Sequence, residues 1–147
     1  MIHGILNVRK EKGFTSHDVV AKLRGMTRQK KIGHTGTLDP DAEGVLPVCL
    51  GKATRLCEMM TDKEKAYEAV LVLGKETDTQ DLGGQILNET ETNHLTKAEV
   101  EEAILSFLGS YDQIPPMYSA LKVGGKKLYE LAREGSEVER KARRVEI

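Results

Sequence analysis

Residues 33–51, GHTGTLDPDAEGVLPVCLG, join a glycine-containing bend to an apolar run, and this stretch decides the fold. Gly36 permits a tight bend, and the proline after Asp39 excludes the helical conformation at that aspartate. The apolar residues at 44–50 predict a buried strand directly after the bend. Because the bend is anchored to that strand, we expect the carboxylate of Asp39 to be held in a loop of fixed geometry.

The acidic residues of this bend match a cation-binding loop only in part. The run DPDAEG at 39–44 fits the first half of an EF-hand loop, but the twelfth position, which requires a glutamate, is Leu50. No GK[ST] phosphate loop and no G-x-S-x-G serine motif is present, and His34 has no zinc-binding partner at i+4. Two interpretations of Asp39 stay open: a carboxylate that acts as nucleophile or base, and an ordinary Asp-Pro turn.

The charge of the chain is small in total but unevenly distributed. The 147 residues are 39% apolar and 31% charged, with a net charge of −1, which suits one domain or a piece of one. Residues 1–31 hold eight basic and two acidic residues (+6), residues 32–118 hold six and sixteen (−10), and residues 119–147 hold eight and five (+3). Basic ends around an acidic middle are compatible with a local nucleic-acid interface.

The two cysteines and the lengths of the apolar runs bear on where the protein works. Cys49 and Cys57 are eight residues apart and fit no zinc or disulfide pattern, so we expect reduced core thiols in a cytoplasmic protein. The apolar runs are too short to span a bilayer, and the first residues lack the cleavage pattern of a signal peptide.

Hydrophobic periodicity and capping signals predict an α+β fold. Thr15 with Asp18, and Thr96 with Glu99, form two capping boxes that mark helix starts. Residues 65–74, KAYEAVLVLG, place apolar side chains on both faces of a strand, which predicts an interior strand. The expected strands are 2–8, 44–50, 65–74, 117–123 and 143–147; the expected helices are 15–31, 52–60, 95–109 and 126–134, with a loop at 75–85 and a turn at 124–125.

Four stretches of the chain, in order, resemble motifs of the tRNA pseudouridine synthase B family, which isomerises a uridine in the T-loop of tRNA, at position 55. Residues 33–55 resemble the family signature, 7–20 its first motif, 65–85 its tyrosine-bearing strand and 113–135 its RNA-contacting insertion. The resemblance implies a pseudouridine synthase-like fold, in which helices flank a mixed, mostly antiparallel sheet. It also implies that residues 112–135 form the RNA-contacting insertion.

The resemblance further implies a role for each matching residue. Asp39 is implied to be the catalytic aspartate, His34 to enter the T-loop and fill the space of the displaced base, and Tyr67 to stack on the flipped uracil. The other residues implied to bind substrate or RNA are Lys10, Gly33, Thr35, Gly36, Thr37, Lys126 and Lys127. The implied partner is the T-arm of tRNA, bound by a monomer, and the isomerisation requires neither cofactor nor metal.

Two departures from the family pattern set further expectations. Glu11 follows Lys10 where the family usually has proline, which we expect to alter only a local turn. A later Gly-Thr-Tyr-Ile-Arg stretch, whose arginine pairs with the catalytic aspartate, and a C-terminal RNA-binding domain of PUA type are both missing. We therefore expect an N-terminal part of a longer enzyme, weak or inactive alone. The alternatives are a tRNA-binding module without catalytic activity and a small carboxylate-dependent lyase.

Overall fold

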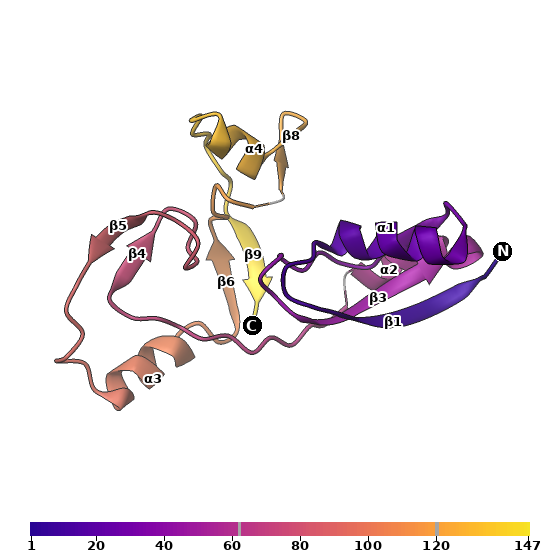
Figure 1. The fold of residues 1–147 in the computed structure, drawn as a ribbon. Helices are drawn as coiled ribbons and strands as arrows, with labels where there is room; N and C mark the ends of the chain where they lie inside the picture. Colours follow the sequence, from indigo (N-terminus) through magenta and orange to yellow (C-terminus); the bar gives the residue numbers. More distant parts are fainter. Residues whose placement is uncertain (62, 120) are drawn as a thin grey trace. The chain divides into compact units, whose positions relative to one another are not determined.

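The computed structural model describes residues 1–61, 63–119 and 121–147 as helices, strands and connecting loops (Figure 1). The chain forms two compact units, Met1–Glu68 and Ala69–Ile147. Every strand pairing among the described residues is antiparallel, and helices are interspersed with the strands along the chain. This mixture confirms the predicted α+β class.

The first unit is built on a three-stranded sheet. Strands β1 (Gly4–Lys10), β3 (Gly44–Leu50) and β2 (Ile32–His34) lie in the order β1-β3-β2. The register pairs Lys10 with Gly44 and His34 with Val48. The predicted buried strand at 44–50 is therefore confirmed as the central strand. Its side chains at Leu46 and Val48 are at most 1% exposed, as expected where the sheet is covered.

Helix α1 (Ser16–Thr27) packs against this sheet through Val19 and Val20, which join Ile32, Leu46, Val48 and Leu50 in one apolar core. The predicted capping box begins the helix: the Thr15 hydroxyl accepts from the Asp18 N–H at 3.0 Å, and the Asp18 carboxylate accepts from the Thr15 N–H at 2.9 Å. These hydrogen bonds from Thr15 lower the pKa of Asp18. The helix ends four residues before the predicted Lys31, because Arg28 adopts a left-handed conformation with φ 51°.

The segment after β3 turns sharply into a helix. The predicted helix at 52–60 is a 3₁₀ turn, η1 (Gly51–Leu56), followed by α2 (Cys57–Thr61). Gly51 has φ 59°, and a Cβ atom there would lie 2.6 Å from the carbonyl oxygen of Ile2. Only glycine fits this turn, in which the start of η1 lies close to the first residues of the chain.

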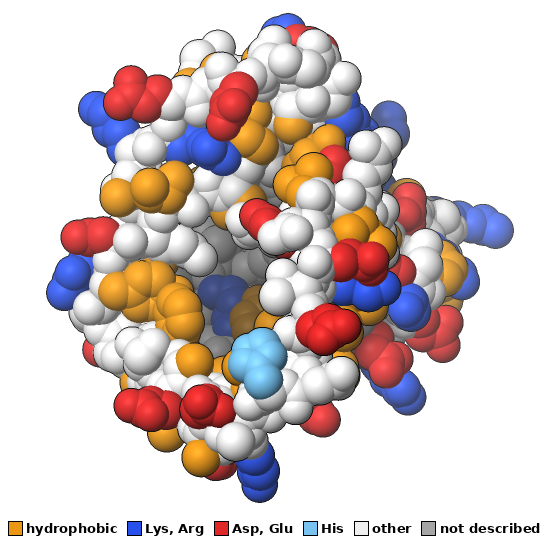
Figure 2. Space-filling model, turned by 90° about the vertical axis from the view of Figure 1, so that its left-hand side faces the viewer, with side chains coloured by type: hydrophobic (Ala, Val, Ile, Leu, Met, Phe, Trp, Pro, Cys, Tyr) orange, Lys and Arg blue, Asp and Glu red, His pale blue; other side chains and the backbone are white. Residues whose placement is uncertain are grey.

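The predicted interior strand at 65–74 is wrong as a strand in this structure. These residues form no ladder with any strand of the described residues, and the apolar side chains of Val70 and Leu71 are 91% and 64% exposed. A strand exists only where a neighbour accepts and donates its backbone hydrogen bonds, so apolar periodicity alone does not create one. Hydrophobic side chains also reach the surface on the face shown in Figure 2.

In its described residues, the second unit contains three two-stranded ladders and two helices. The predicted loop at 75–85 begins in fact with strand β4 (Lys75–Thr77), which pairs with β5 (Ile86–Glu89). The predicted helix at 95–109 is confirmed as α3 (Lys97–Leu105), with the Thr96–Glu99 capping box at its start. The predicted strand at 143–147 is confirmed as β9 (Arg143–Glu146), which pairs with β6 (Ser110–Gln113).

A hairpin and a short helix lie in sequence between β6 and β9. Strands β7 (Lys122–Val123) and β8 (Lys126–Lys127) meet at the predicted Gly124–Gly125 turn, and α4 (Leu128–Arg133) follows. The ladder is shorter than the predicted strand at 117–123, of which Ala120 lies outside the described residues. Since β6 pairs with β9, the segment that carries the hairpin and α4 begins and ends at adjacent strands.

Candidate nucleobase-modification site

The Asp39 bend is fixed at several points by backbone and side-chain hydrogen bonds. The Ser16 hydroxyl, 2% exposed, accepts from the Leu38 N–H at 2.9 Å and donates to the Leu38 carbonyl at 3.3 Å. The Gly13 N–H donates to the Pro40 carbonyl at 2.8 Å, and the Thr35 N–H to the Pro47 carbonyl at 3.1 Å. The bend is therefore held by α1, by the turn before α1 and by β3.

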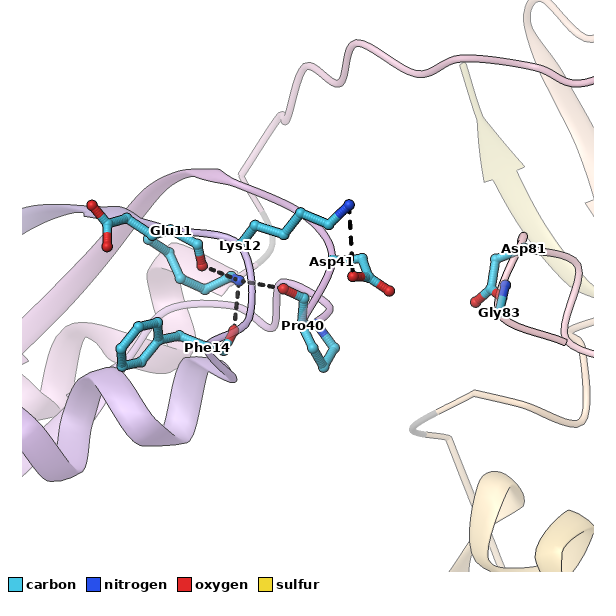
Figure 3. Close-up of polar contacts among 8 residues, drawn as sticks. Glu11, Lys12, Phe14, Pro40, Asp41, Asp81 and Gly83 are labelled. Atoms are coloured by element: carbon cyan, nitrogen blue, oxygen red, sulfur yellow. Dashed lines mark hydrogen bonds and ion pairs between the residues drawn. The ribbon is translucent and has the colours of Figure 1, made fainter.

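Lys10 supplies a further tie from inside the first unit (Figure 3). Its Nζ donates to the carbonyl oxygens of Phe14 at 2.6 Å, Glu11 at 3.1 Å and Pro40 at 3.4 Å. Three carbonyls match the three donors of a lysine, and the residue is 0% exposed. The buried Nζ is not available to an RNA phosphate. Lys10 therefore positions the Asp39 bend instead of making the RNA contact that the resemblance implied.

The residue after Lys10 also takes part in this arrangement. Glu11, which stands where the family pattern has proline, offers its carbonyl oxygen to Lys10. Lys12 and Asp41 form an ion pair at 3.9 Å (Figure 3), with side chains that are 72% and 86% exposed. An ion pair so exposed adds little stability. The buried lysine, rather than this surface pair, connects the first turn to the Asp39 bend.

Asp39 itself is exposed and begins a turn. Its carbonyl oxygen accepts from the Ala42 N–H at 3.1 Å, so the backbone takes part in the bend. Within residues 1–61, 63–119 and 121–147, the Asp39 carboxylate forms no hydrogen bond or ion pair. A carboxylate that the fold does not use is free to act on a bound molecule.

A cavity of about 390 Å³ lies beside the bend in the first unit. Its lining combines the bend at Thr35, Gly36 and Thr37 with Tyr67 and with part of β3. Tyr67 is 69% exposed, so its ring is accessible to a ligand. The structure thus brings together three of the expected glycine and threonine positions and the expected stacking tyrosine. His34 and Asp39 flank the lining residues in sequence but are not part of the lining.

His34 and Gly33 belong to β2, directly before the bend. The Nδ1 atom of His34 is buried and has no hydrogen-bond partner among the described residues, an arrangement that is uncommon for a histidine with a purely structural role. A Cβ atom at Gly33 would lie 3.3 Å from the Cys57 sulfur. Gly33 therefore permits close packing of α2 on the sheet, which is a structural use of this residue.

Among the described residues, the cysteines and the possible metal ligands add little further chemistry. Burial raises the pKa of the Cys49 thiol to about 11, and a hydrogen bond with Cys57 adds to this shift, so Cys49 is a protonated core thiol at neutral pH. Among the described residues, no three His, Cys, Asp or Glu side chains gather as a metal site would require. No helix of the described chain has the length and apolarity needed to cross a membrane.

Comparison with known proteins identifies the family. The pattern of the TruB family pseudouridylate synthase (N terminal domain) matches residues 24–147. The chain is 53% identical over 146 residues to the tRNA pseudouridine synthase B of Clostridium perfringens SM101, and 55% identical over 146 residues to that of Alkaliphilus oremlandii. Both alignments cover 99% of this chain, and they cover 50% and 48% of the respective relatives.

The chain belongs to the TruB family. It spans about half the length of the curated relatives it matches, including that of Bacillus pumilus, to which it is 51% identical over 148 residues and of which it covers 48%. A chain in the crystal structure of a Cbf5-Nop10-Gar1 complex superposes with a TM-score of 0.55 at 29% identity, over 82% of this chain and 31% of that chain. This likeness supports the α+β fold that the motifs implied.

Sequence reasoning missed one residue of this TruB site, Ser16. It directly follows the Thr15 cap, and no pattern in the sequence marks its contact with Leu38, 22 residues away. The Ser16 hydroxyl bonds both the N–H and the carbonyl of Leu38. At this one residue of the bend it makes the backbone hydrogen bonds that a neighbouring strand would otherwise make. Ser16 precedes Val19 and Val20 by three and four residues, so it lies on the same side of the helix as the apolar stripe. A small polar residue at that position is the one signal in the sequence that could have indicated its role.

Ser16→Ala is expected to destabilise the protein by about 1–3 kcal/mol, because the Leu38 N–H and carbonyl lose their partner in a buried position. The measurement is the free energy of unfolding from urea titration. Ser106→Ala is the matched control, since Ser106 is the exposed residue directly after α3 and, within the described residues, its hydroxyl bonds only the Ala103 carbonyl. Equal losses from the two variants would contradict the assigned role of Ser16.

Proposed function

We propose that the full-length protein isomerises uridine to pseudouridine in the T-loop of tRNA, at position 55. The observation that carries the proposal is the exposed Asp39 carboxylate, which has no partner among the described residues and lies in a bend that hydrogen bonds hold beside the Tyr67 cavity. Membership of the TruB family, and relatives named tRNA pseudouridine synthase B, agree with it.

The reaction assigns a distinct task to each side chain. The N1–C1′ bond of the uridine breaks, the base turns and C5 bonds to C1′; the C5 hydrogen leaves as a proton and N1 takes up a proton, so the product is an isomer of the uridine. Asp39 acts on the base or sugar as nucleophile, or deprotonates an intermediate. A base must leave the RNA stack to be reached, so Tyr67 stacks on the uracil and His34 occupies the vacated space. No electrons and no group pass to a second molecule, so the proposal includes no cofactor or metal.

The described chain is proposed to be the N-terminal part of the catalytic domain. The support is that the alignments cover about half of each relative. An arginine that pairs with Asp39 and a PUA-type RNA-binding domain would then belong to the remaining half. An arginine near Asp39 would keep the carboxylate ionised and oriented. We further propose that the full-length enzyme is a cytoplasmic monomer and that residues 112–135 contact the T-arm.

The test is tritium release from a T-arm RNA that carries 5-tritiated uridine at the target position. The longest reading frame that contains this sequence is expected to release one tritium per RNA, and the 147-residue chain alone is expected to be weak or inactive. The competing hypothesis, a tRNA-binding module without chemistry, predicts RNA binding by the longer protein with no tritium release. Full activity of the 147-residue chain would contradict the proposed division of the domain.

A further inference from the structure

Three side chains of β8 and α4 converge on one phenol in the second unit. The Lys127 Nζ donates to the Tyr129 hydroxyl oxygen at 3.0 Å and lies 5.2 Å from the centre of the Tyr129 ring. The Arg133 guanidinium carbon lies 5.4 Å from the same ring centre. Two cationic groups therefore each lie within 5.4 Å of the centre of one phenol ring, and one of them is hydrogen-bonded to its hydroxyl.

Lys127 and Arg133 differ from the neighbouring Lys126 in whether a carboxylate pairs with them. Lys126 is neutralised by Glu134, both of whose carboxylate oxygens lie 3.0 Å from its Nζ. Within the described residues, neither Lys127 nor Arg133 forms an ion pair with a carboxylate. The acid nearest to Lys127 in sequence, Glu130, accepts the backbone N–H of Lys127 at 2.9 Å. Lys127 and Arg133 thus present positive charge that no ion pair within the described residues neutralises.

The local structure holds the three side chains in place. Gly124 and Gly125, with φ of 59° and 89°, form the turn that returns the chain into β8, and only glycine adopts such angles without strain. Lys127 is the residue before α4, and the Tyr129 N–H donates to the Ser119 carbonyl at 3.1 Å. Arg133 lies one turn further along α4, on the same side as Tyr129.

We propose that Lys127, Tyr129 and Arg133 form a binding site for one phosphate group of the tRNA backbone. The inference rests on the proposed function and adds to it the position of a phosphate contact. A guanidinium offers paired donors that match phosphate oxygens, the ammonium offers a point charge, and the phenol oxygen, which accepts from Lys127, keeps its own hydrogen to donate. Such contacts fix the position of RNA on a protein without selecting its sequence.

The proposed site distinguishes Lys127 from Lys126, although the motif resemblance implies an RNA contact for both. Both Lys126 and Lys127 are implied RNA contacts, yet only Lys127 keeps an uncancelled charge. The Lys126–Glu134 pair adds no net charge to the surface, so its removal should not change the number of counterions that RNA binding releases. The structure assigns the phosphate contact to Lys127 with Arg133 and leaves Lys126 out of it.

The test measures the dissociation constant of a T-arm RNA hairpin as a function of KCl concentration, with the longest reading frame that contains this sequence. Lys127→Gln and Arg133→Gln are each expected to weaken binding roughly tenfold at low salt. The double variant is expected to lower the slope of log K against log salt by about one unit rather than two, because both cations neutralise the same phosphate. Tyr129→Phe keeps both charges, so a weaker affinity with an unchanged slope is expected.

The control removes the ion pair between β8 and the residue after α4 without changing the net charge. Lys126→Gln with Glu134→Gln is expected to leave both the affinity and the salt slope unchanged. Unchanged binding by the Lys127 and Arg133 variants, or an equal loss of slope in the control, would overturn the phosphate site. Tritium release at saturating RNA tells the two failures apart: an active wild type with unaffected variants refutes only this site, whereas a wild type that releases no tritium refutes the proposed function.

Discussion

Asp39→Asn is expected to lower the rate of pseudouridine formation by about 10²- to 10⁴-fold or more in the full-length protein, while its affinity for tRNA changes little. The amide has nearly the shape of the carboxylate but is neither a base nor a nucleophile at neutral pH. The bend uses the Asp39 carbonyl, which accepts from Ala42, and not its side chain. The substitution therefore removes the chemistry and leaves the loop in place.

The measurement combines single-turnover tritium release with the dissociation constant for T-arm RNA. Asp41→Asn is the matched control, because Asp41 is another exposed carboxylate of the same bend and, within the described residues, its side chain pairs only with Lys12, at 3.9 Å. The control is expected to keep its rate within about twofold, as surface changes usually do. If Asp39→Asn retained the wild-type rate, or if both variants lost it alike, Asp39 would not be the catalytic carboxylate.

The parts of the fold that could be predicted from sequence are those fixed by neighbouring residues. The capping boxes at Thr15 and Thr96 involve residues three apart, and both appear as predicted. The strand at 44–50 is an apolar run with few alternatives to a strand that buries most of its side chains, and Leu46, Val48, Cys49 and Leu50 are buried in it. The Gly124–Gly125 turn follows from the conformations that only glycine adopts easily.

Strand pairing could not be predicted in the same way, because it depends on distant partners. Residues 65–74 have the stronger strand pattern, yet they pair with nothing among the described residues, whereas residues 110–113 have a weak pattern and pair with β9. Periodicity reports which side chains avoid water; it does not report whether a neighbouring backbone is present. The apolar exposure of Val70 and Leu71 is the result of this difference.

The candidate site shows the same limit at the level of single residues. The motif resemblance indicated Asp39 and Tyr67, and the structure places the bend and the tyrosine around one cavity. The contacts that hold the bend, from Ser16 to Leu38 and from Lys10 to Pro40, join residues 22 and 30 positions apart. Each is a side chain that bonds a backbone group, and such a bond leaves no pattern in the residue types on either side.

Lys10→Met is expected to destabilise the protein by about 2–4 kcal/mol, because three carbonyl oxygens lose a donor that belongs to a residue with 0% exposure. Methionine keeps most of the apolar stem of lysine, so the loss reports the hydrogen bonds rather than a cavity. Because the Pro40 carbonyl is one of the three, the substitution also loosens the bend that carries Asp39. A fall in the rate of pseudouridine formation with little change in tRNA affinity is therefore expected.

The free energy of unfolding, from urea titration of the full-length protein, tests the size of this effect. Lys12→Met is the matched control, since it makes the same chemical change two residues away on a side chain that is 72% exposed. It is expected to cost less than about 0.5 kcal/mol. If Lys10→Met were as stable as the Lys12 variant, the three carbonyls would have found other partners, and the bend would not depend on Lys10. If it were destabilised but formed pseudouridine at the wild-type rate below its unfolding transition, Lys10 would support the fold without positioning Asp39.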